Sequence, residues 1–294
     1  MWRIGFLHTF YFFNYKQTMK KTILAVACFS MALFATSCGN ASKKEAAKEE
    51  PKEVAFEING TPFYVGEDGF VTIFDGTSLA GWRGYGKDHV PSRWTIEDDC
   101  LAFKGTGTGE GQTAEGGDII FDYKFKNFTM EFDWKVEKGS NSGVFYLAQE
   151  VRNAEDTGWE PIYISAPEYQ ILDNVNHPDA MLGVDGNRQS SSLYDMIPAK
   201  PQNSKPFGEW NTGKILVYKG TVVHFQNDEK VLEYHLWTPQ WTELLQNSKF
   251  SEAAWPRAFE LLNNLGGENH EGFIGFQDHG DNVYFRNIRV KIMD

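Results

Sequence analysis

The sequence predicts an all-β protein in which two antiparallel sheets pack face to face as a sandwich or jelly roll, with one short helix and long loops. Three observations favour this fold class. Apolar and polar residues alternate with a period of two through most of the chain after Phe56, turn-forming residues separate the alternating runs, and a single segment has a helical pattern. Aromatic residues make up 15% of the 294 residues, which supplies large side chains for a core between two sheets.

The clearest predicted strand is 128–136. Its five large apolar residues alternate with polar ones, so they share one face, as in an antiparallel strand that is buried on one side. Similar alternation predicts further strands at 143–148, 168–172, 214–218, 221–225, 230–237, 272–276 and 282–292.

Turn and helix signals connect these strands. Lys219-Gly220 and Asn227-Asp228 lie where two-residue hairpin turns would join residues 214–237 into a three-stranded meander. The helix is expected at 238–247, because Pro239 falls in its first turn. No repeat or linker divides the chain from residue 54 to residue 294, so we predict one domain there.

The first 53 residues have the composition of an export leader followed by a tether. Met19-Lys20-Lys21 precedes an apolar run that is short for a membrane-spanning helix, and small residues follow it. We predict that residues 1–37 are a signal peptide whose true start is Met19. Ala35-Thr36-Ser37-Cys38 resembles the lipobox of bacterial lipoproteins, which implies lipidation of Cys38 and a flexible tether over 38–53. The protein is therefore expected to be exported and held at a bacterial envelope membrane by its lipid alone.

Charge and missing motifs exclude several classes of function. With 28 basic and 40 acidic residues, the formal charge is −12, which disfavours a surface that follows nucleic-acid phosphates. Three cysteines are too few for a disulfide framework in a chain of this length. The sequence contains no Gly-x-Ser-x-Gly elbow, phosphate loop, Rossmann glycine pattern or Cys-x-x-Cys motif. We therefore expect no nucleotide or other cofactor.

Polar residues at strand spacing mark the first candidate site. Glu168 and Gln170 share one face of their predicted strand, and Tyr169 and Ile171 share the other. If the tyrosine and isoleucine face the core, a carboxylate and an amide project from the opposite surface of the sheet. That surface is either the floor of a ligand groove or an ordinary solvated face.

A second group of polar residues lies near the C-terminus. By strand parity, Gln277 and His279 share one face, and Arg286 shares a face with apolar residues from Ile288 onward. An arginine on an apolar face has to pair with a carboxylate or reach a cleft, because burying an unpaired guanidinium is very costly. Both interpretations of Arg286 are open.

Two further patterns have structural as well as functional interpretations. Asp278, His279 and Asp281 could be metal ligands, but loops that bind hard cations normally supply more oxygen ligands than this, so we predict no metal. Asn141-Ser142-Gly143 and Ser191–Asp195 fit either a site or plain turn chemistry.

Several short blocks occur together in one order between about Val71 and Lys291. They are Phe74-Asp75-Gly76, Leu79-Ala80-Gly81-Trp82, Trp94-Thr95-Ile96-Glu97-Asp98, Asn141-Ser142-Gly143-Val144-Phe145, Glu168-Tyr169-Gln170-Ile171-Leu172-Asp173, Glu209-Trp210-Asn211 and Phe285-Arg286-Asn287-Ile288. These blocks resemble the bacterial family once called DUF1080, now described as 3-keto-disaccharide hydrolases, 3-keto-glucoside 1,2-lyases and 3-keto-2-hydroxy-glucal hydratases. The resemblance implies a concanavalin A-like jelly roll. Two segments depart from the family, 152–166 and 236–267, and their aromatic residues are expected to reshape the groove.

The resemblance also implies a chemistry. A ketone at C3 of a sugar acidifies the proton on C2, so a base can remove that proton and the C1 aglycone can leave by β-elimination; water then adds to the resulting glucal. Such a site needs a base, a donor for the enolate oxygen and an acid for the leaving group. We predict Glu168 as the base and His279 as the acid or second proton carrier. The predicted substrate-binding residues are Gln170 and Arg286, which would hold the ketone and hydroxyls, and Asn141, Asp173, Tyr194 and Gln277.

Two alternatives belong to other functional classes. A non-catalytic carbohydrate-binding lipoprotein would use aromatic platforms such as Trp237 or Trp255 and would need no base. A conventional jelly-roll glycoside hydrolase would place two carboxylates across the scissile bond. Glu131-Phe132-Asp133-Trp134-Lys135 ends in lysine where the second glutamate of such a strand should be, which disfavours the glycosidase.

Overall fold

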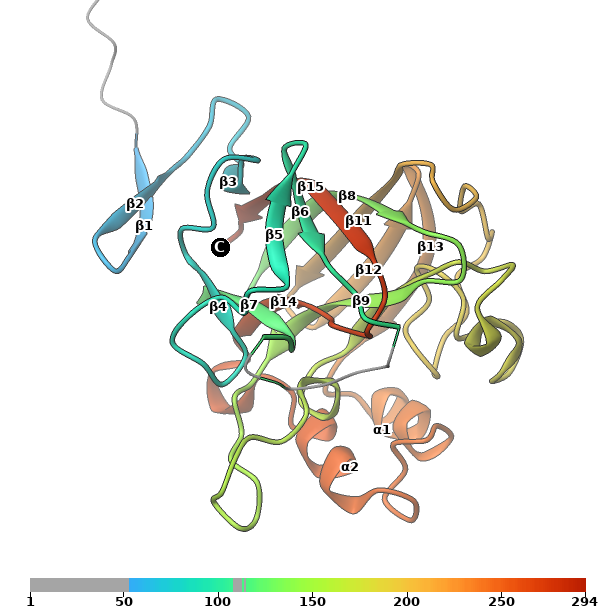
Figure 1. Ribbon diagram of the computed structural model, residues 1–294. Helices are drawn as coiled ribbons and strands as arrows, with labels where there is room; N and C mark the ends of the chain where they lie inside the picture. The colour runs from blue at the N-terminus through green and yellow to red at the C-terminus, as the bar shows by residue number, and fades with distance from the viewer. Residues whose placement is uncertain (1–52, 108–112, 114) are drawn as a thin grey trace, which may run out of the picture. The chain divides into compact units, whose positions relative to one another are not determined.

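The computed structural model describes residues 53–107, 113 and 115–294, which all fall in one compact unit, Glu50–Asp294. Within this part of the chain, the strands form two large antiparallel sheets and one small hairpin (Figure 1). The predicted all-β sandwich is confirmed. The leader, Cys38 and nearly all of the tether lie outside the described residues. No helix in the described ranges has the length and apolar composition needed to cross a membrane.

The larger sheet has β8 and β15 at its centre. In order of pairing, its strands are β13 (Glu229–His235), β12 (Thr221–Gln226), β11 (Asn211–Tyr218), β8 (Phe128–Val136), β15 (Val283–Ile292), β6 (Cys100–Phe103) and β5 (Trp94–Glu97), and β3 (Val71–Phe74) also pairs with β15. Strand β8 has the predicted bounds, and every second residue along it is buried. The alternation in the sequence therefore gave both the element and its inward face.

The smaller sheet carries the candidate site. In order of pairing, its strands are β10 (Glu168–Leu172), β9 (Asn141–Ala148), β14 (Gly272–Phe276), β7 (Ile119–Phe125) and β4 (Trp82–Gly84). A separate hairpin pairs β1 (Val54–Ile58) with β2 (Thr61–Tyr64). Strand β1 begins at the residue where the sequence places the start of the domain.

Aromatic side chains from the two sheets meet in the core. The rings of Phe276 on β14 and Phe285 on β15 lie 4.2 Å apart, centroid to centroid. The rings of Phe132 on β8 and Tyr169 on β10 meet edge to face at 5.4 Å. One face of the smaller sheet is thereby fixed against the larger sheet, and its other face is left to form a site.

The predicted meander of β11, β12 and β13 is confirmed, as are its turns. Lys219 and Gly220 have φ values of 48° and 85°, and Asn227 and Asp228 have values of 49° and 66°. Two successive residues with positive φ are typical of the type I′ turns that match the twist of a hairpin.

The prediction of a single helix is wrong. Helix α1 (Pro239–Gln246) lies within the predicted segment and is capped by Thr238, whose hydroxyl accepts a hydrogen bond from the Trp241 backbone. A second helix, α2 (Pro256–Asn263), packs against α1 (Figure 1). Three short 3₁₀ helices also occur in the described chain, η1 (Ile162–Ile164), η2 (Pro178–Met181) and η3 (Gly267–Asn269). With only eight residues, α2 is too short for a helical period to stand out in the sequence.

Candidate active site

The candidate site lies on the face of the smaller sheet that points away from the sandwich core. Tyr169 and Ile171 of β10 are fully buried in the core. Glu168 and Gln170 point to the other side and line a cavity. The predicted division of faces is therefore correct, and the polar face forms a cavity wall instead of an open solvated surface.

This cavity has a volume of about 400 Å³, which falls within the range for small-molecule sites. Its wall combines residues from β9 and β10, from the loop that follows β14 and from the two segments that depart from the family pattern. The lining residues are Asn141, Tyr163, Glu168, Gln170, Tyr194, Lys249, Trp255, Gln277 and His279. The structure thus brings together six of the eight predicted catalytic and substrate-binding residues.

Gly143 creates the space that Glu168 occupies. Strands β9 and β10 pair with Gly143 opposite Gln170 and Phe145 opposite Glu168. A Cβ atom added at Gly143 would lie 2.8 Å from both Cγ and Cδ of Glu168, and it would be closer still to Oε1. The Glu168 side chain therefore lies across a backbone that only glycine leaves open, and the Asn141-Ser142-Gly143 motif belongs to the site.

The other two residues of this motif connect β9 to the loop after β14. The Ser142 hydroxyl donates a 2.8 Å hydrogen bond to the Gln277 carbonyl, and the Gln277 N–H donates one of 2.9 Å to the Gly143 carbonyl. The Asn141 N–H donates to Oδ2 of Asp281 at 3.1 Å. These bonds hold the Gln277–Asp281 loop beside Glu168.

Two buried amides present unused hydrogen-bonding atoms. Asn141 and Gln170 are 2% and 1% exposed. Within the described part of the chain, Oδ1 of Asn141 and Nε2 of Gln170 have no hydrogen-bond partner, although Oε1 of Gln170 accepts from the Ile171 N–H. Buried polar atoms are rarely left unpaired, so an acceptor and a donor on the cavity wall favour a ligand with hydroxyl or carbonyl groups.

Lys249 adds a positive charge that the sequence analysis did not identify. Its ammonium lies 4.3 Å from the centre of the Tyr194 ring, and the Tyr194 hydroxyl donates to Asp179 at 2.9 Å. Although Lys249 reaches solvent, desolvation by the surrounding wall lowers its pKa, and the negative charges of Glu168 and Asp195 partly oppose this shift. No motif in the sequence marks this lysine, because a loop of the aromatic segment brings it to the site.

The rest of that aromatic segment has several roles. Trp255 lines the cavity as expected, together with Tyr163 from the 152–166 segment. Trp241 is fully buried in the core. The Trp237 ring stacks on His270 with centroids 3.7 Å apart and lines a different cavity. Both segments therefore contribute side chains to the wall of the candidate cavity, whereas Trp237 does not.

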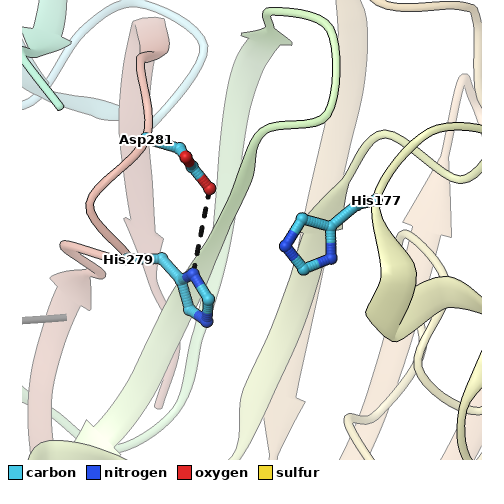
Figure 2. Close-up of side chains that lie close together, drawn as sticks. All are labelled: His177, His279 and Asp281. Carbon is cyan, nitrogen blue, oxygen red and sulfur yellow. Dashed lines mark ion pairs between the residues drawn. The ribbon is translucent and has the colours of Figure 1, made fainter. Parts of the chain in front are cut away.

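A group of titratable residues lies at the His279 edge of the cavity (Figure 2). Nδ1 of His279 lies 3.9 Å from Oδ2 of Asp281, and His177 lies opposite them on a separate loop. Asp278 does not belong to this group, because its carboxylate accepts hydrogen bonds from the N–H groups of Gly117 and Gly280. Burial raises the pKa of Asp278.

Asp173 was predicted to bind substrate, but it does not line the cavity. Its carboxylate accepts hydrogen bonds from the backbone N–H groups of Gly139, Val175 and Asn176 and from the Asn176 side chain. These four bonds hold the turn that follows β10. Asp173 therefore supports the loop that carries His177 and is not part of the cavity wall.

The predicted face of Arg286 is wrong, and the arginine pairs with a carboxylate, which is one of the two interpretations that the sequence left open. Asn287 has a φ of 53°, and the pairing of β15 with β8 shifts register between Arg286 and Arg289. This bulge reverses the parity, so Arg286 does not share a face with Ile288. Its Nε donates to Asp133 at 3.0 Å, on the outer face of the larger sheet, and its guanidinium lies 4.0 Å from the Trp210 ring centre.

That outer face has a larger cavity of about 750 Å³, but the two carboxylates that β8 contributes to it, Glu131 and Asp133, are held in ion pairs. Asp133 accepts from Arg286, and Glu131 lies 2.7 Å from both Lys214 and Arg289. Carboxylates held in ion pairs of this kind are poor proton carriers. The smaller cavity, with its unused amide atoms, is the stronger candidate site.

Comparison with known proteins agrees with this fold and these motifs. Residues 69–291 match the model of the 3-keto-alpha-glucoside-1,2-lyase-like domain. The chain is 63% identical over 290 residues to a protein of Bacteroides thetaiotaomicron named 3-keto-disaccharide hydrolase, covering 94% of this chain and all of that protein. A solved structure from Parabacteroides distasonis is similar with a TM-score of 0.62 and 27% identity, over 77% of this chain and 95% of that one. A second from the same organism has a TM-score of 0.50 and 22% identity, over 72% and 99% of the two chains. The chain therefore belongs to the 3-keto-alpha-glucoside-1,2-lyase-like domain family.

Proposed function

We propose that this protein cleaves 3-keto-glycosides by removing the C2 proton and expelling the C1 aglycone, with or without hydration of the resulting glucal. Membership of the family and the name of the Bacteroides relative support the substrate class. One structural observation carries the proposal. Glu168 is held over Gly143 in a cavity whose walls offer the unpartnered amide atoms of Asn141 and Gln170.

The reaction needs one base and one acid. The Glu168 carboxylate takes the C2 proton, and the electron pair of the C–H bond becomes the enolate of the C3 ketone. When the ketone re-forms, a double bond forms between C1 and C2, the bond from C1 to the aglycone oxygen breaks, and that oxygen takes a proton. Water added across the double bond places hydroxyl on C1 and hydrogen on C2, so the net result is hydrolysis.

Two N–H groups in the cavity can supply the leaving-group proton. His279 is the group predicted from the sequence, and Lys249 is the group that the structure adds. A lowered pKa makes the Lys249 ammonium a better proton donor than an ordinary lysine. Tyr163, Tyr194 and Trp255 provide aromatic faces on which a sugar ring can stack.

A conventional glycosidase is less consistent with this site. Such enzymes use two carboxyl groups on either side of the scissile bond. Among the described residues that line the cavity, Glu168 is the single carboxylate. Glu131 and Asp133 lie on the other sheet and are bound to basic side chains.

Incubation with defined sugars separates the candidate functions. We expect 3-keto-trehalose and a 3-keto-β-glucoside to be consumed with transient 2-hydroxy-3-keto-glucal, which NMR detects. Tight calorimetric binding of these sugars without turnover would support the non-catalytic binding protein instead. Cleavage of unoxidised glucan would support the glycosidase.

We further propose that the protein is an exported lipoprotein attached to a bacterial envelope membrane through Cys38. The basic start at Met19, the apolar run and the small residues before the cysteine support this. Expression in a bacterial host with an alkyne fatty acid should label the wild-type protein in the membrane fraction. The Cys38→Ala variant should be unlabelled, and equal labelling of both would contradict the proposal.

A further inference from the structure

We propose that His177, His279 and Asp281 bind a divalent transition-metal ion at the edge of the candidate cavity. The existence of this site stands on geometry alone, whereas its catalytic role rests on the proposed function. From the sequence, Asp278, His279 and Asp281 formed the possible ligand group, and no metal was predicted there. The structure replaces Asp278 by His177, which changes the ligand set from mostly oxygen to mostly nitrogen.

The three side chains converge from two separate loops (Figure 2). His177 precedes η2, and His279 and Asp281 belong to the loop between β14 and β15. One ligand atom from each residue lies within 4.8 Å of the others. Metal bonds of about 2.0–2.2 Å place ligand atoms roughly 3.0–3.5 Å apart, so small side-chain rotations complete the site.

One of the ligands is already oriented by a neighbour. Oδ2 of Asp281 accepts the Asn141 N–H, which fixes the carboxylate beside His279 at 3.9 Å. The rings of His177 and His279 are 5.8 Å apart and nearly perpendicular, so they do not stack across the space between them. Hydrogen bonds that orient metal ligands are a regular feature of such sites.

His177 has one hydrogen bond that metal binding would change. Its Nδ1 accepts a 3.2 Å bond from the Asp179 N–H. Coordination through Nε2 moves the ring proton to Nδ1 and breaks that bond. The exchange costs one long hydrogen bond and gains a metal–nitrogen bond, so it favours the bound state.

The donor set selects the class of metal. Two imidazoles and one carboxylate suit zinc, manganese, iron(II) or cobalt, whereas calcium and magnesium prefer sites built from oxygen. Three protein ligands leave positions open for substrate, which is typical of catalytic sites and unlike closed structural ones.

The proposed metal site lies at the edge of the candidate cavity, so an open coordination position on the metal would face the substrate. His279 lines the same cavity as Glu168 and Asn141. A metal there would polarise the C3 ketone and stabilise the enolate oxygen that forms when Glu168 takes the C2 proton. His279 would then be a ligand and could not carry a proton, so the leaving-group proton would come from Lys249.

Metal binding is measured first without substrate. The full chain, treated with EDTA and dialysed, is titrated with ZnCl₂ and MnCl₂ by calorimetry, and with CoCl₂ while visible absorption is recorded. We expect one metal per chain, and binding at least about 100-fold weaker in His177→Ala and Asp281→Ala. His235→Ala, which removes an exposed histidine outside the group, should bind like the wild type. No binding by the wild type at micromolar metal, or unchanged binding by His177→Ala, would overturn the site.

Turnover of a 3-keto-glucoside then tests the role. We expect the EDTA-treated enzyme to lose activity and to regain it with one equivalent of metal. Full turnover by metal-free enzyme would overturn the catalytic role while leaving the proposed function intact. Stoichiometric metal binding without any turnover would support the site and contradict the proposed function.

Discussion

Replacement of Gly143 by alanine should move the Glu168 carboxylate without changing its chemical identity, so it tests whether the position of the carboxylate matters for catalysis. Glu168 keeps its identity and its charge, and the change adds a single methyl group on the neighbouring strand. The added Cβ would lie 2.8 Å from Cγ and Cδ of Glu168. Carbon atoms in ordinary contact are at least about 3.4 Å apart, so these atoms have to move by roughly 0.6 Å, and the nearer Oε1 by about 1 Å.

A displacement of this size has a predictable kinetic consequence. A reacting group that is misplaced by about 1 Å can cost on the order of 100-fold in rate. We therefore expect Gly143→Ala to lower kcat for a 3-keto-glucoside by about 100-fold, which corresponds to roughly 2.7 kcal/mol in the barrier. KM should change far less, because Asn141 and Gln170 remain in place.

The assay follows 2-hydroxy-3-keto-glucal and free aglycone under steady-state conditions, with a thermal melt to confirm folding. Gly158→Ala is the matched control. Its Cβ would meet just one described neighbour, Nδ2 of Asn153 at 3.6 Å, which is an ordinary contact. Wild-type kcat in a folded Gly143→Ala protein would contradict this prediction, because the carboxylate would then need no fixed position.

Three further predictions concern a proton donor, a buried histidine and an arginine. Lys249→Met should lower kcat for cleavage of a 3-keto-glucoside with an alkyl leaving group by about 100-fold. For a substrate with a 4-nitrophenol leaving group the loss in kcat should be less than about 5-fold, since a good leaving group needs no acid. Lys230→Met is the surface control. Burial lowers the pKa of His224 to about 4, so the unfolded chain binds more protons between about pH 6.5 and 4. Its contribution to stability is therefore lost as pH falls through that window, by about 3 kcal/mol, and urea unfolding of His224→Gln should lack this pH dependence. Arg286→Met should leave turnover unchanged and lower the free energy of unfolding by no more than about 1 kcal/mol, because its ion pair is partly exposed.

Each of these predictions has a result that would contradict it. Equal losses of Lys249→Met on both leaving groups would assign the lysine to positioning instead of proton transfer. Parallel pH dependence of stability in wild type and His224→Gln would show that another group titrates in that window; His235→Gln serves as the exposed control. A large loss of turnover in Arg286→Met would show that Arg286 contributes to catalysis or substrate binding.

Regular alternation explains which strands the sequence could predict. Strand β8 alternates along its whole length between the core and the outer face, so its period is visible in the residue types. The strands before it are shorter or buried on both faces, as in β6, where all four residues are buried. A continuous apolar run has no period, and a strand of three to five residues is too short to show one, so alternation predicted none of the strands from β1 to β7.

The candidate site was predictable where strand parity held and unpredictable where it broke. Glu168 and Gln170 lie on a regular strand, and their shared face followed from their spacing. The bulge at Asn287 reversed the parity of Arg286, and a positive φ at an asparagine cannot be foreseen from alternation. Lys249 and His177 reach the cavity edge from loops, and tertiary folding alone brings such residues together.

Proton transfer from C2 is the step on which the proposed reaction depends. In D₂O, NMR can follow the C2 proton of a 3-keto-glucoside together with release of the aglycone, for the wild type and for Glu168→Gln. We expect the wild type to release the aglycone only where the C2–H bond is broken. We expect the variant to break neither bond, while calorimetry still detects substrate binding. Turnover by Glu168→Gln at the wild-type rate would contradict the assignment of Glu168 as the base.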